Sequence, residues 1–491
     1  MPEEIHLAAV VRRVDWGRIA ILLLGVLLFA VVYFSGAWPD AVDPKGVHFV
    51  LTHEGKACLA LSLLALTWWL GEVVPIGVTS VAIGVVQALF LIRSPRSAFT
   101  DFMDPSVWFI IGSLVIGMVF TRTGLTQRAA YRMLLLVGER TRIIYLGCFA
   151  TTGLMTLVMA HTAVAAVTFP LLMAVYSLYP EDDKPTRFGK GLFIGMAFAA
   201  GAGSIVTLLG SARAPVAIGF FKEMAGREIS FVEMSYYMLP LGWGMAILLW
   251  LFCMVFFRPE QKTIPGLHER ARALHSRLGP MSRNERLALV IVLATVAVLS
   301  LRSFVPALER LDQSAIILVS TVLFFVLRVL ELKDLEEIPW NIVLLFGGAM
   351  SLGLCLWQTG AASWLAVSCL VLFQGMHWLL FVLGAALFVL VITNVVLNVA
   401  AIAICLPVAL VIARYQGVAP EVVLFSLLAA AGMPFLTLFG AAPNAIAYGS
   451  RQFTPGEFFT AGMPASLMLL VVLGLFVSVV WPLMGMPVLL R

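Results

Sequence analysis

The chain has 491 residues, of which 61% are hydrophobic and 12% are charged. Soluble domains are about 45–50% apolar and about 25% charged, so this composition excludes a soluble protein and predicts a polytopic membrane protein. The net charge of +5 comes from loop arginines beside apolar runs, where membrane topology accounts for it, and we expect no nucleic-acid partner.

Apolar runs predict eleven membrane spans, because a helix needs about 20 apolar residues to cross a bilayer. The expected spans lie near 18–35, 57–71, 76–92, 106–121, 191–220, 235–257, 286–304, 314–330, 341–357, 421–450 and 464–488. No small-residue cleavage site follows the first run, so we expect a retained span and not a removed signal peptide.

Two further apolar stretches, about 142–178 and 363–412, are interrupted at their middles by polar residues. Non-helical backbone at membrane depth is tolerated only where it packs in protein or lines a cavity. We therefore expect each stretch to form a re-entrant hairpin that enters and leaves on the same side of the membrane.

Basic residues gather in three clusters: Arg12, Arg13 and Arg18; Arg122, Arg128, Arg132, Arg140 and Arg142; and Arg258, Lys262, Arg270, Arg272, Arg277, Arg283 and Arg286. Eleven spans and two hairpins place all three clusters on one side, which the positive-inside rule makes the cytoplasm. This predicts a cytoplasmic N-terminus, an outside C-terminus and a basic cytoplasmic linker at 258–285 that forms a surface helix.

The two interrupted stretches contain related motifs. MTLVMAHTAVAAVTFP, at 155–170, is echoed by ITNVVLNVAAIAICLP, at 392–407. In each motif a Thr precedes a His or Asn by five residues, and a Pro follows nine residues later: Thr156, His161 and Pro170; Thr393, Asn398 and Pro407. The shared order of elements predicts two inverted repeats, 1–257 with spans 1–6 and 286–491 with spans 7–11. Matching interruptions in inverted halves point to a transporter's midplane site.

A broken span follows each hairpin. The first is AGAGSIVTLLGSARAP at 200–215, and the second is PFLTLFGAAPNA at 434–445. A break frees N–H groups at a positive helix end and carbonyl groups at a negative one. The free N–H groups suit an anion and the free carbonyl groups suit a cation, so an anion and a coupling ion could share the site.

Five segments carry a family resemblance: WWLGEVVPIGVTS at 68–80, DPSVWFIIGS at 104–113, RTGLTQRAA at 122–130, IPWNIVLLFGG at 338–348, and TLFGAAPNAI at 437–446. In this order they resemble the divalent anion:sodium symporter family of dicarboxylate and citrate transporters, within the ion transporter superfamily. The resemblance covers nearly the whole chain. It implies a homodimer with a scaffold of spans 1–3 and 7–8 and a transport part that moves as an elevator.

Members of that family carry Ser-Asn-Thr at both hairpin tips, where asparagines face the substrate and nearby hydroxyls and carbonyls bind sodium. Here the tips read Ala-His-Thr at 160–162 and Leu-Asn-Val at 397–399, and the family's first T-P-P-N loop reads Ser-Ala-Arg-Ala at 211–214. The expected substrate-binding residues are His161, Thr162, Arg213, Asn398, Val399, Pro443 and Asn444. The resemblance implies a sodium site at Thr393, Asn398, Thr437 and Gly440.

Two of these residues have alternatives. His161 is either a substrate contact or a satisfied core histidine, and Arg213 either replaces a sodium ion, holds the anion, forms a structural ion pair or lies at an exposed mouth. We expect a secondary transporter in a bacterial inner membrane that moves a small anion, either a di- or monocarboxylate or a sulfate-like ion. Sodium symport is the first expectation, and anion exchange or proton coupling through His161 is the second.

Other classes fit less well. A sodium/proton antiporter would need an intramembrane Asp or Glu at the broken spans, and none is visible there. An enzyme or lipid carrier would show HExxH, paired carboxylates or a serine–lysine pair in a span, or a lipid-facing groove, so we expect neither an enzyme nor a bound cofactor. A non-transporting receptor is not distinguished by the sequence.

Overall fold

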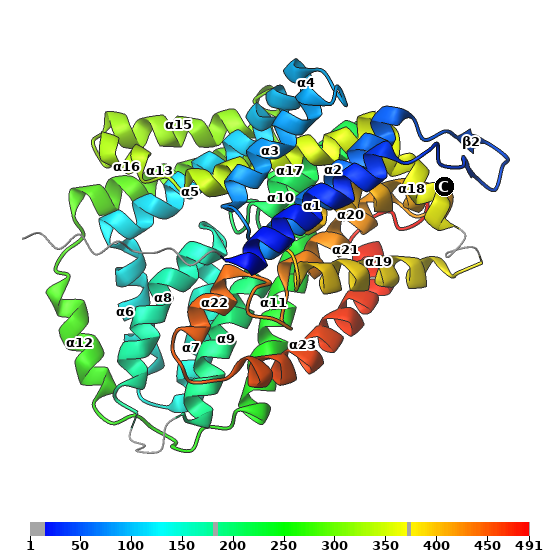
Figure 1. The fold of residues 1–491 in the computed structure, drawn as a ribbon. Helices are drawn as coiled ribbons and strands as arrows, with labels where there is room; N and C mark the ends of the chain where they lie inside the picture. The colour runs from blue at the N-terminus through cyan, green and yellow to red at the C-terminus, as the bar shows by residue number, and fades with distance from the viewer. Residues whose placement is uncertain (1–14, 180–184, 371–374, 491) are drawn as a thin grey trace, which may run out of the picture.

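The computed structural model describes residues 15–179, 185–370 and 375–490, and helices account for nearly all of its regular structure (Figure 1). The exception is a short antiparallel pair, β1 (Ala41–Val42) and β2 (His48–Phe49), between the first two helices. This pair modifies the all-helical prediction only in a loop. Arg12 and Arg13 of the first basic cluster lie outside the described residues.

The first half runs from α1 to α11. Its helices are α1 (Trp16–Phe34), α2 (His53–Gly71), α3 (Ile76–Leu89), α4 (Pro95–Thr100), the 3-10 turn η1 (Asp101–Met103), α5 (Pro105–Thr123), α6 (Leu125–Val137), α7 (Thr141–Met155), α8 (His161–Tyr176), α9 (Arg187–Gly203), α10 (Arg213–Ala225) and α11 (Phe231–Phe256).

The second half follows α12 (Leu267–Arg277), which lies within the expected linker. Its helices are α13 (Arg283–Leu301), α14 (Pro306–Glu309), α15 (Gln313–Val326), α16 (Leu332–Glu336), α17 (Trp340–Gln358), α18 (Ala361–Leu370), α19 (Trp378–Thr393), α20 (Asn398–Tyr415), α21 (Pro420–Gly432), α22 (Ala442–Tyr448), α23 (Pro455–Leu475), a π-helical segment (Phe476–Val480) and α24 (Trp481–Leu483).

The order of elements from α5 to α11 recurs from α17 to α23. Each series has a long helix, a shorter helix, two hairpin arms, a broken helix and another long helix. Start and stop signals explain the long first members. The Asp104 carboxylate caps α5 by accepting from the backbone N–H of Ser106, and left-handed glycines follow both helices, at Gly124 (φ 85°) and Gly360 (φ 74°).

The second hairpin begins later than the sequence suggested. Its first arm, α19, starts at Trp378, whereas the apolar stretch was expected to enter the hairpin at about 363. Residues 361–370 form the separate helix α18, and 371–374 lie outside the described residues. An unbroken apolar composition does not reveal where one apolar helix ends and the next begins.

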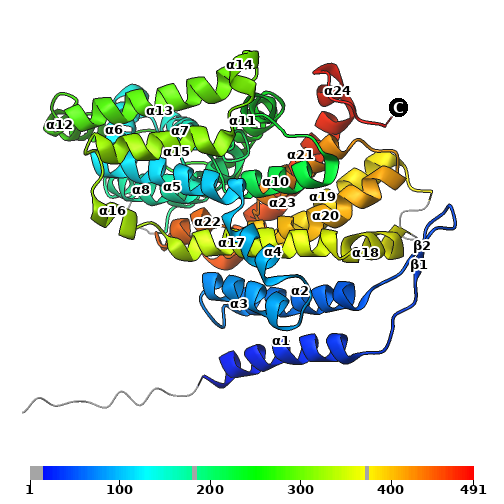
Figure 2. The same ribbon diagram turned by 90° about the horizontal axis from the view of Figure 1, so that it is seen from above.

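The helices pack as two groups. In the first group α1 lies on α2, α2 and α17 pack on α3, and α5 and α13 pack on α15. Figure 2 shows α1, then α2 and α3, then α17 as successive layers. The second group contains both hairpins, both broken helices, α11 and α23. We call these groups the outer group and the core group. They meet where α10 packs against α5 and α17, and where α20 packs against α17.

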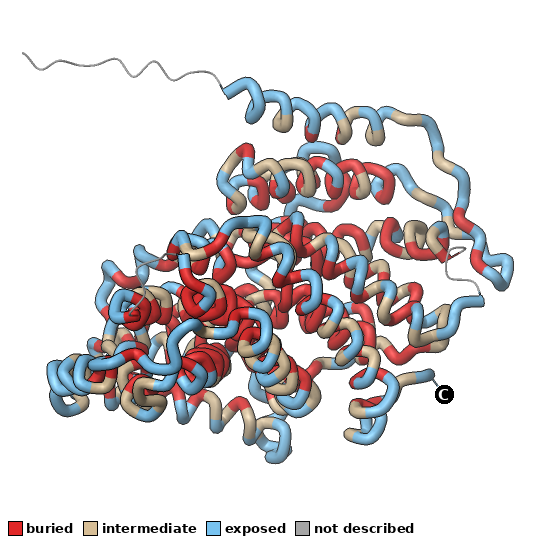
Figure 3. Tube along the Cα trace, turned by 90° about the horizontal axis from the view of Figure 1, so that it is seen from below, coloured by how far each residue is buried: buried red, intermediate tan, exposed pale blue. Residues whose placement is uncertain are grey.

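Much of the outer surface is apolar. Within the described chain, seven helical stretches are at least 18 residues long and apolar enough to cross a membrane, and six shorter apolar helices accompany them. Most of α1 is exposed, as Figure 3 shows, and its exposed side chains include Leu23, Leu27 and Val31. This surface suits lipid, because lipid tails are as apolar as these side chains. The count of eleven spans stays a prediction.

Glu260 ties the linker to the base of α9. Its carboxylate accepts from the backbone N–H groups of Arg187 (2.5 Å) and Phe188 (3.1 Å) and from the hydroxyl of Tyr179 (3.0 Å). Burial acts to raise the pKa of Glu260, but these donors outweigh it, so its pKa lies below the ordinary value of 4.5.

A carboxyl with a lowered pKa stabilises the folded state above its unfolded pKa, and that contribution is lost as pH falls through the folded pKa. We therefore expect Glu260→Gln to lower the melting temperature at pH 7 by about 2–4 °C, for a loss of about 1 kcal/mol. The variant should lose less further stability than the unaltered protein below about pH 4. Glu269→Gln, an exposed change on α12, is the control, and equal shifts in the two variants would contradict the assignment.

Candidate functional site

The tip of the first hairpin is bonded to the first helix break. The first tip comprises residues 156–161, which run from the end of α7 to the first residue of α8, and the first break comprises residues 204–212 between α9 and α10. The backbone N–H of His161 donates to the carbonyl of Gly210 (3.0 Å), and its ring Nδ1 lies 3.3 Å from the same oxygen. The Thr207 hydroxyl donates to the carbonyl of Leu157 (2.8 Å).

The second tip, residues 393–398, meets the second break, residues 433–441, in the same way. The Thr437 hydroxyl donates to the carbonyl of Asn394 (2.5 Å). The Asn394 side chain adds three bonds: its Oδ1 accepts from the N–H groups of Leu436 (2.8 Å) and Thr437 (3.0 Å), and its Nδ2 donates to the carbonyl of Leu390 (2.7 Å).

Asn394 is a site residue that the sequence analysis missed. Leu157 and Asn394 occupy matching positions, each directly after the motif threonine, and each offers its carbonyl to the threonine of the following break. The missed signal was a second amide inside the apolar motif of the second half, at a position where the first half has leucine. In both halves a threonine of the break donates to a carbonyl of the tip, but only the second half adds hydrogen bonds from an asparagine side chain.

Glycines permit the close approach of tip and break. A Cβ atom at Gly210 would lie 2.6 Å from the carbonyl oxygen of Thr156, and one at Gly440 would lie 3.2 Å from that of Thr393. Separations below about 3 Å are severe overlaps, so Gly210 is required sterically and Gly440 is tightly packed. Gly440, predicted as part of a sodium site, therefore allows the second break to pack against the second tip because it lacks a side chain.

Both second arms begin with uncapped helix ends. The residues before α8 and α20, Ala160 and Leu397, give no side-chain cap to the first-turn N–H groups. His161 and Thr162 begin α8 and are half-buried, while Asn398 begins α20 and is also half-buried. Within the described chain, no hydrogen bond is made by the side chains of Thr162 and Asn398, so both can serve a ligand. Val399 is buried and supplies only apolar contact.

The broken helices connect the two halves. The helix after each break packs on the hairpin of the opposite half, because α10 lies on α20 and α22 lies on α8. The ends of α9 and α21 also meet, since a Cβ atom at Gly201 would lie 3.1 Å from the carbonyl oxygen of Gly432. The sequence shows neither crossing.

Arg213 lies buried at this meeting point, with 1% of its surface exposed. Its Nη2 donates to the hydroxyl of Ser204 (2.8 Å), the residue that ends α9, and its guanidinium packs against Gly432, the last residue of α21. Its Nη1 has no hydrogen-bond partner, and the described residues offer it no ion pair. The alternatives of an exposed mouth position and of an ion pair therefore do not hold for the described chain.

Asn444 and Pro443 have supporting positions. The Asn444 amide is buried and donates to the carbonyls of Pro434 (2.8 Å) and Thr437 (2.9 Å), so it satisfies carbonyls that the break frees. Pro443 is buried in the first turn of α22. Both residues shape the break, and the amide donors of Asn444 are already used.

The oxygens around the second tip suit a hard cation. Thr393 is buried, and its hydroxyl lies 3.4 Å from the carbonyl of Ala431 near the end of α21. Hydroxyls that donate to a carbonyl keep lone pairs free, and the carbonyls of an unwound segment in a discontinuous membrane helix commonly coordinate sodium. Thr393, Thr437 and the carbonyls of this tip and break therefore fit a sodium ion.

The chain is similar to known transporters along almost its whole length. The family model described as the sodium:sulfate symporter transmembrane region matches residues 24–487. A sodium-dependent dicarboxylate transporter, SdcS, of Staphylococcus saprophyticus is 26% identical, covering 96% of this chain and 93% of that protein. SdcS of Staphylococcus aureus is also 26% identical, covering 95% of this chain and 92% of its own length.

Two solved structures share the fold. MtrF of Neisseria gonorrhoeae, from a class of antimetabolite efflux pumps, superposes with a TM-score of 0.56 at 14% identity, covering 94% of this chain and 93% of its own. The YdaH transporter of Alcanivorax borkumensis gives a TM-score of 0.56 at 15% identity, covering 96% and 98%. The predicted all-helical membrane fold is confirmed, and the inverted arrangement of the two halves stays a prediction. Because the relatives are transporters, the prediction that the chain is not an enzyme is also confirmed. The protein is an integral membrane transporter, and it belongs to the sodium:sulfate symporter family.

Proposed function

We propose that the protein carries a small anion, a di- or monocarboxylate or a sulfate-like ion, which binds between the two hairpin tips. The observation that carries this proposal is the pair of uncapped helix ends at His161 and Asn398, joined by the free side chains of Thr162 and Asn398. The N–H of His161 donates to Gly210, but the other N–H groups of these first turns have no side-chain cap, and such groups at a positive helix end attract an anion. The SdcS relatives, which are sodium-dependent dicarboxylate transporters, support a carboxylate.

We infer that sodium is the coupling ion and binds at the second tip, through Thr393, Thr437 and backbone oxygens. The support is the oxygen-rich surroundings, the tight packing at Gly440, and the two hydrogen bonds by which the Asn394 Oδ1 atom holds the break. When bound, sodium would supply positive charge beside the anion. The chain itself orients the oxygens and excludes other side chains from the tip.

At the first tip, we propose that the Arg213 guanidinium takes the place of a sodium ion. It lies where the C-terminal ends of α9 and α21 meet, and such ends carry partial negative charge that favours a cation. The charge of an arginine side chain stays in the site throughout the cycle, whereas a bound sodium ion must be released to solution. The protein would then use at least one sodium ion fewer than a relative with two occupied sites.

The proposed motion is an elevator movement of the core group against the outer group in each subunit of a homodimer, with the two halves inverted in the membrane and the N-terminus in the cytoplasm. The division into two packing groups supports this motion, and we assign α5 and α17 to the scaffold in addition to the helices expected there. The recurring order of elements supports the repeats.

Proton-coupled transport or anion exchange is a second candidate, favoured by the half-buried imidazole of His161 at the first tip. If His161 carries a coupled proton, His161→Asn abolishes the pH dependence of uptake, because an amide does not titrate in this range. Uptake by the variant that keeps its pH dependence would exclude the proton role.

The decisive experiment measures binding and uptake with one preparation. The purified protein is melted with mono- and dicarboxylates, sulfate, sulfonates and phosphate, each with sodium, potassium or choline, and the same solutes are tested for uptake into proteoliposomes. A solute that binds the folded state raises the melting temperature by mass action. We expect an anion to do so only with sodium and to be taken up. Stabilisation without uptake would indicate a receptor, and no stabilisation by any anion would contradict the proposal.

A further inference from the structure

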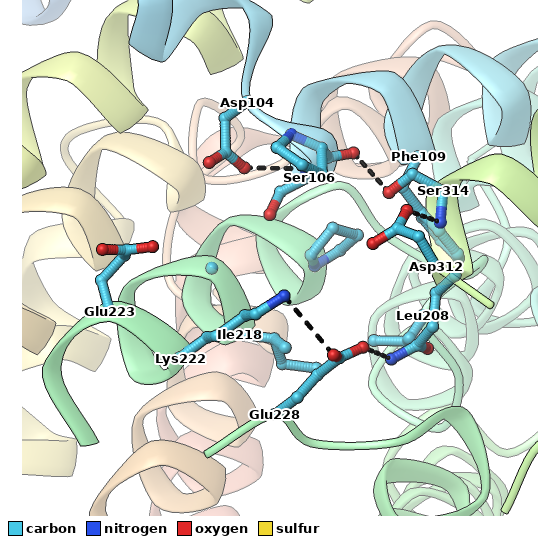
Figure 4. Close-up of a pocket in the computed structure, with 14 residues that line it drawn as sticks. Asp104, Ser106, Phe109, Leu208, Ile218, Lys222, Glu223, Glu228, Asp312 and Ser314 are labelled. Carbon is cyan, nitrogen blue, oxygen red and sulfur yellow. Dashed lines mark hydrogen bonds and ion pairs between the residues drawn. The ribbon is translucent and has the colours of Figure 1, made fainter. Parts of the chain in front are cut away.

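The loop between α10 and α11 joins the core group to the outer group. This loop, residues 226–230, lies beside a cavity of about 110 Å³ whose walls are α5, α10 and the start of α15. Leu208 of the first break also lines the cavity, so the cavity reaches from the loop to this break (Figure 4). We call residues 226–230 the latch loop.

Four polar contacts cross from the latch loop to the outer group. The Oε1 atom of Glu228 accepts from the Gln313 amide at the start of α15 (2.6 Å) and lies 3.2 Å from the guanidinium of Arg302, just after α13. The Gln313 amide also donates to the carbonyl of Ile229 (3.1 Å). The hydroxyls of Ser230 and Ser303 are 3.0 Å apart.

The matching loop of the second half has no such contacts. Residues 449–454, between α22 and α23, bond among themselves and to their own group: Gln452 bonds Ser450 (3.2 Å), Thr454 bonds Glu457 (2.9 Å), and Lys190 of α9 pairs with Glu457 (2.5 Å). Among the described residues, no hydrogen bond or ion pair ties this loop to the outer group. Among the described residues, the latch loop therefore has four polar contacts with the outer group, and the matching loop of the second half has none.

Glu228 also has an alternative partner inside the core group. The Nζ atom of Lys222, on α10, lies 3.5 Å from its Oε2 atom, and the side chain of Glu228 is 26% exposed (Figure 4). If the bonds to Gln313 and Arg302 break, the carboxylate keeps Lys222 and gains water. On opening, the Glu228 carboxylate therefore stays paired, and Arg302 keeps its hydrogen bond to the carbonyl of Leu311 (2.6 Å), so the contact can form and break during a transport cycle.

We propose that Glu228 is a latch that holds the core group against α13 and α15 in this conformation and must release before α10 can slide past α5. This inference rests on the proposed transport function. In this proposal the latch loop stabilises one conformation of the transporter, and the two tips bind the solute.

The test links the latch loop covalently to α15 by a reversible cross-link. In Glu228→Cys/Gln313→Cys a short bifunctional thiol reagent links the two groups, and in the control Lys222→Cys/Glu228→Cys it links two positions of the core group. Of the six native cysteines, four are buried, and the unaltered protein treated with the same reagent accounts for the other two. We expect the first link to reduce uptake more than tenfold, with recovery on reduction, while the control link has no effect.

Solute binding separates the two proposals. The cross-linked Glu228→Cys/Gln313→Cys protein should still be stabilised by the anion and sodium, because both tips are unaltered. Normal uptake by the linked protein, or failure of this pair to link, would overturn the latch. Absence of anion stabilisation in the unaltered protein would instead overturn the transport function and the latch with it.

Discussion

Replacing Arg213 with alanine is expected to weaken anion binding about 10- to 100-fold at low sodium and to make that binding more dependent on sodium. The guanidinium bonds Ser204 and lies at the negative ends of two helices, so its loss removes a charged interaction of about 1.5–3 kcal/mol. The vacated space still lies at the C-terminal ends of α9 and α21, whose partial negative charge favours a cation. Added sodium should therefore enter it and restore part of the binding.

Two further variants separate charge from geometry at this site. Arg213→Lys keeps the charge but has no planar fork of donors, and Ser204→Ala keeps the guanidinium but removes its hydroxyl partner. Both should bind the anion more tightly than Arg213→Ala at low sodium. The measurement is anion binding by calorimetry across a sodium series. An Arg213→Ala protein with unchanged anion affinity and unchanged sodium dependence would exclude the fixed-cation role.

The second large effect is expected at Thr437. In Thr437→Val the hydroxyl that donates to Asn394 (2.5 Å) and accepts from Gly440 (3.2 Å) is lost at nearly constant shape. We expect the sodium concentration for half-maximal uptake to rise at least about tenfold, since a lost ligand of about 1–3 kcal/mol weakens binding by that order. Thr437→Ser should restore sodium affinity.

The first half offers a matched control for this change. The Thr207 hydroxyl donates to Leu157 (2.8 Å) and accepts from Gly210 (3.3 Å), so Thr207→Val removes the same two bonds from the first break. Both variants should melt at lower temperature by similar amounts, but only Thr437→Val should change the sodium dependence. Equal changes in sodium dependence would place the ion elsewhere.

Part of the site could be predicted because the chain repeats itself. Two motifs with the same spacing of Thr, His or Asn, and Pro identified both tips, and the Gly-containing breaks identified the partner segments. The repeat worked because a polar residue in a membrane span needs a local reason to be there. The same reasoning passed over Asn394, whose role is to hold the break and which has no counterpart in the first half.

The roles of Asn444 and Arg213 depended on three-dimensional contacts. Asn444 was expected to touch substrate, yet its amide donors serve the carbonyls of Pro434 and Thr437. Arg213 had several alternatives in the sequence, and its burial between Ser204 and Gly432 removed two of them. The partners of a side chain buried in the membrane domain come from segments that are distant in sequence. The sequence pattern does not predict which of these segments lie close together in space.

The sequence by itself determined that this is a helical membrane protein with two related halves, because the need to satisfy backbone groups in lipid leaves apolar helices as the solution and makes each polar interruption visible. Tertiary structure decided which surfaces meet: α10 on α20, α22 on α8, and the latch loop on α13 and α15. In an apolar chain nearly every helix face can pack on nearly any other, so hydrophobic pattern does not select partners. Shape complementarity at close-packed glycines and a few polar contacts select them.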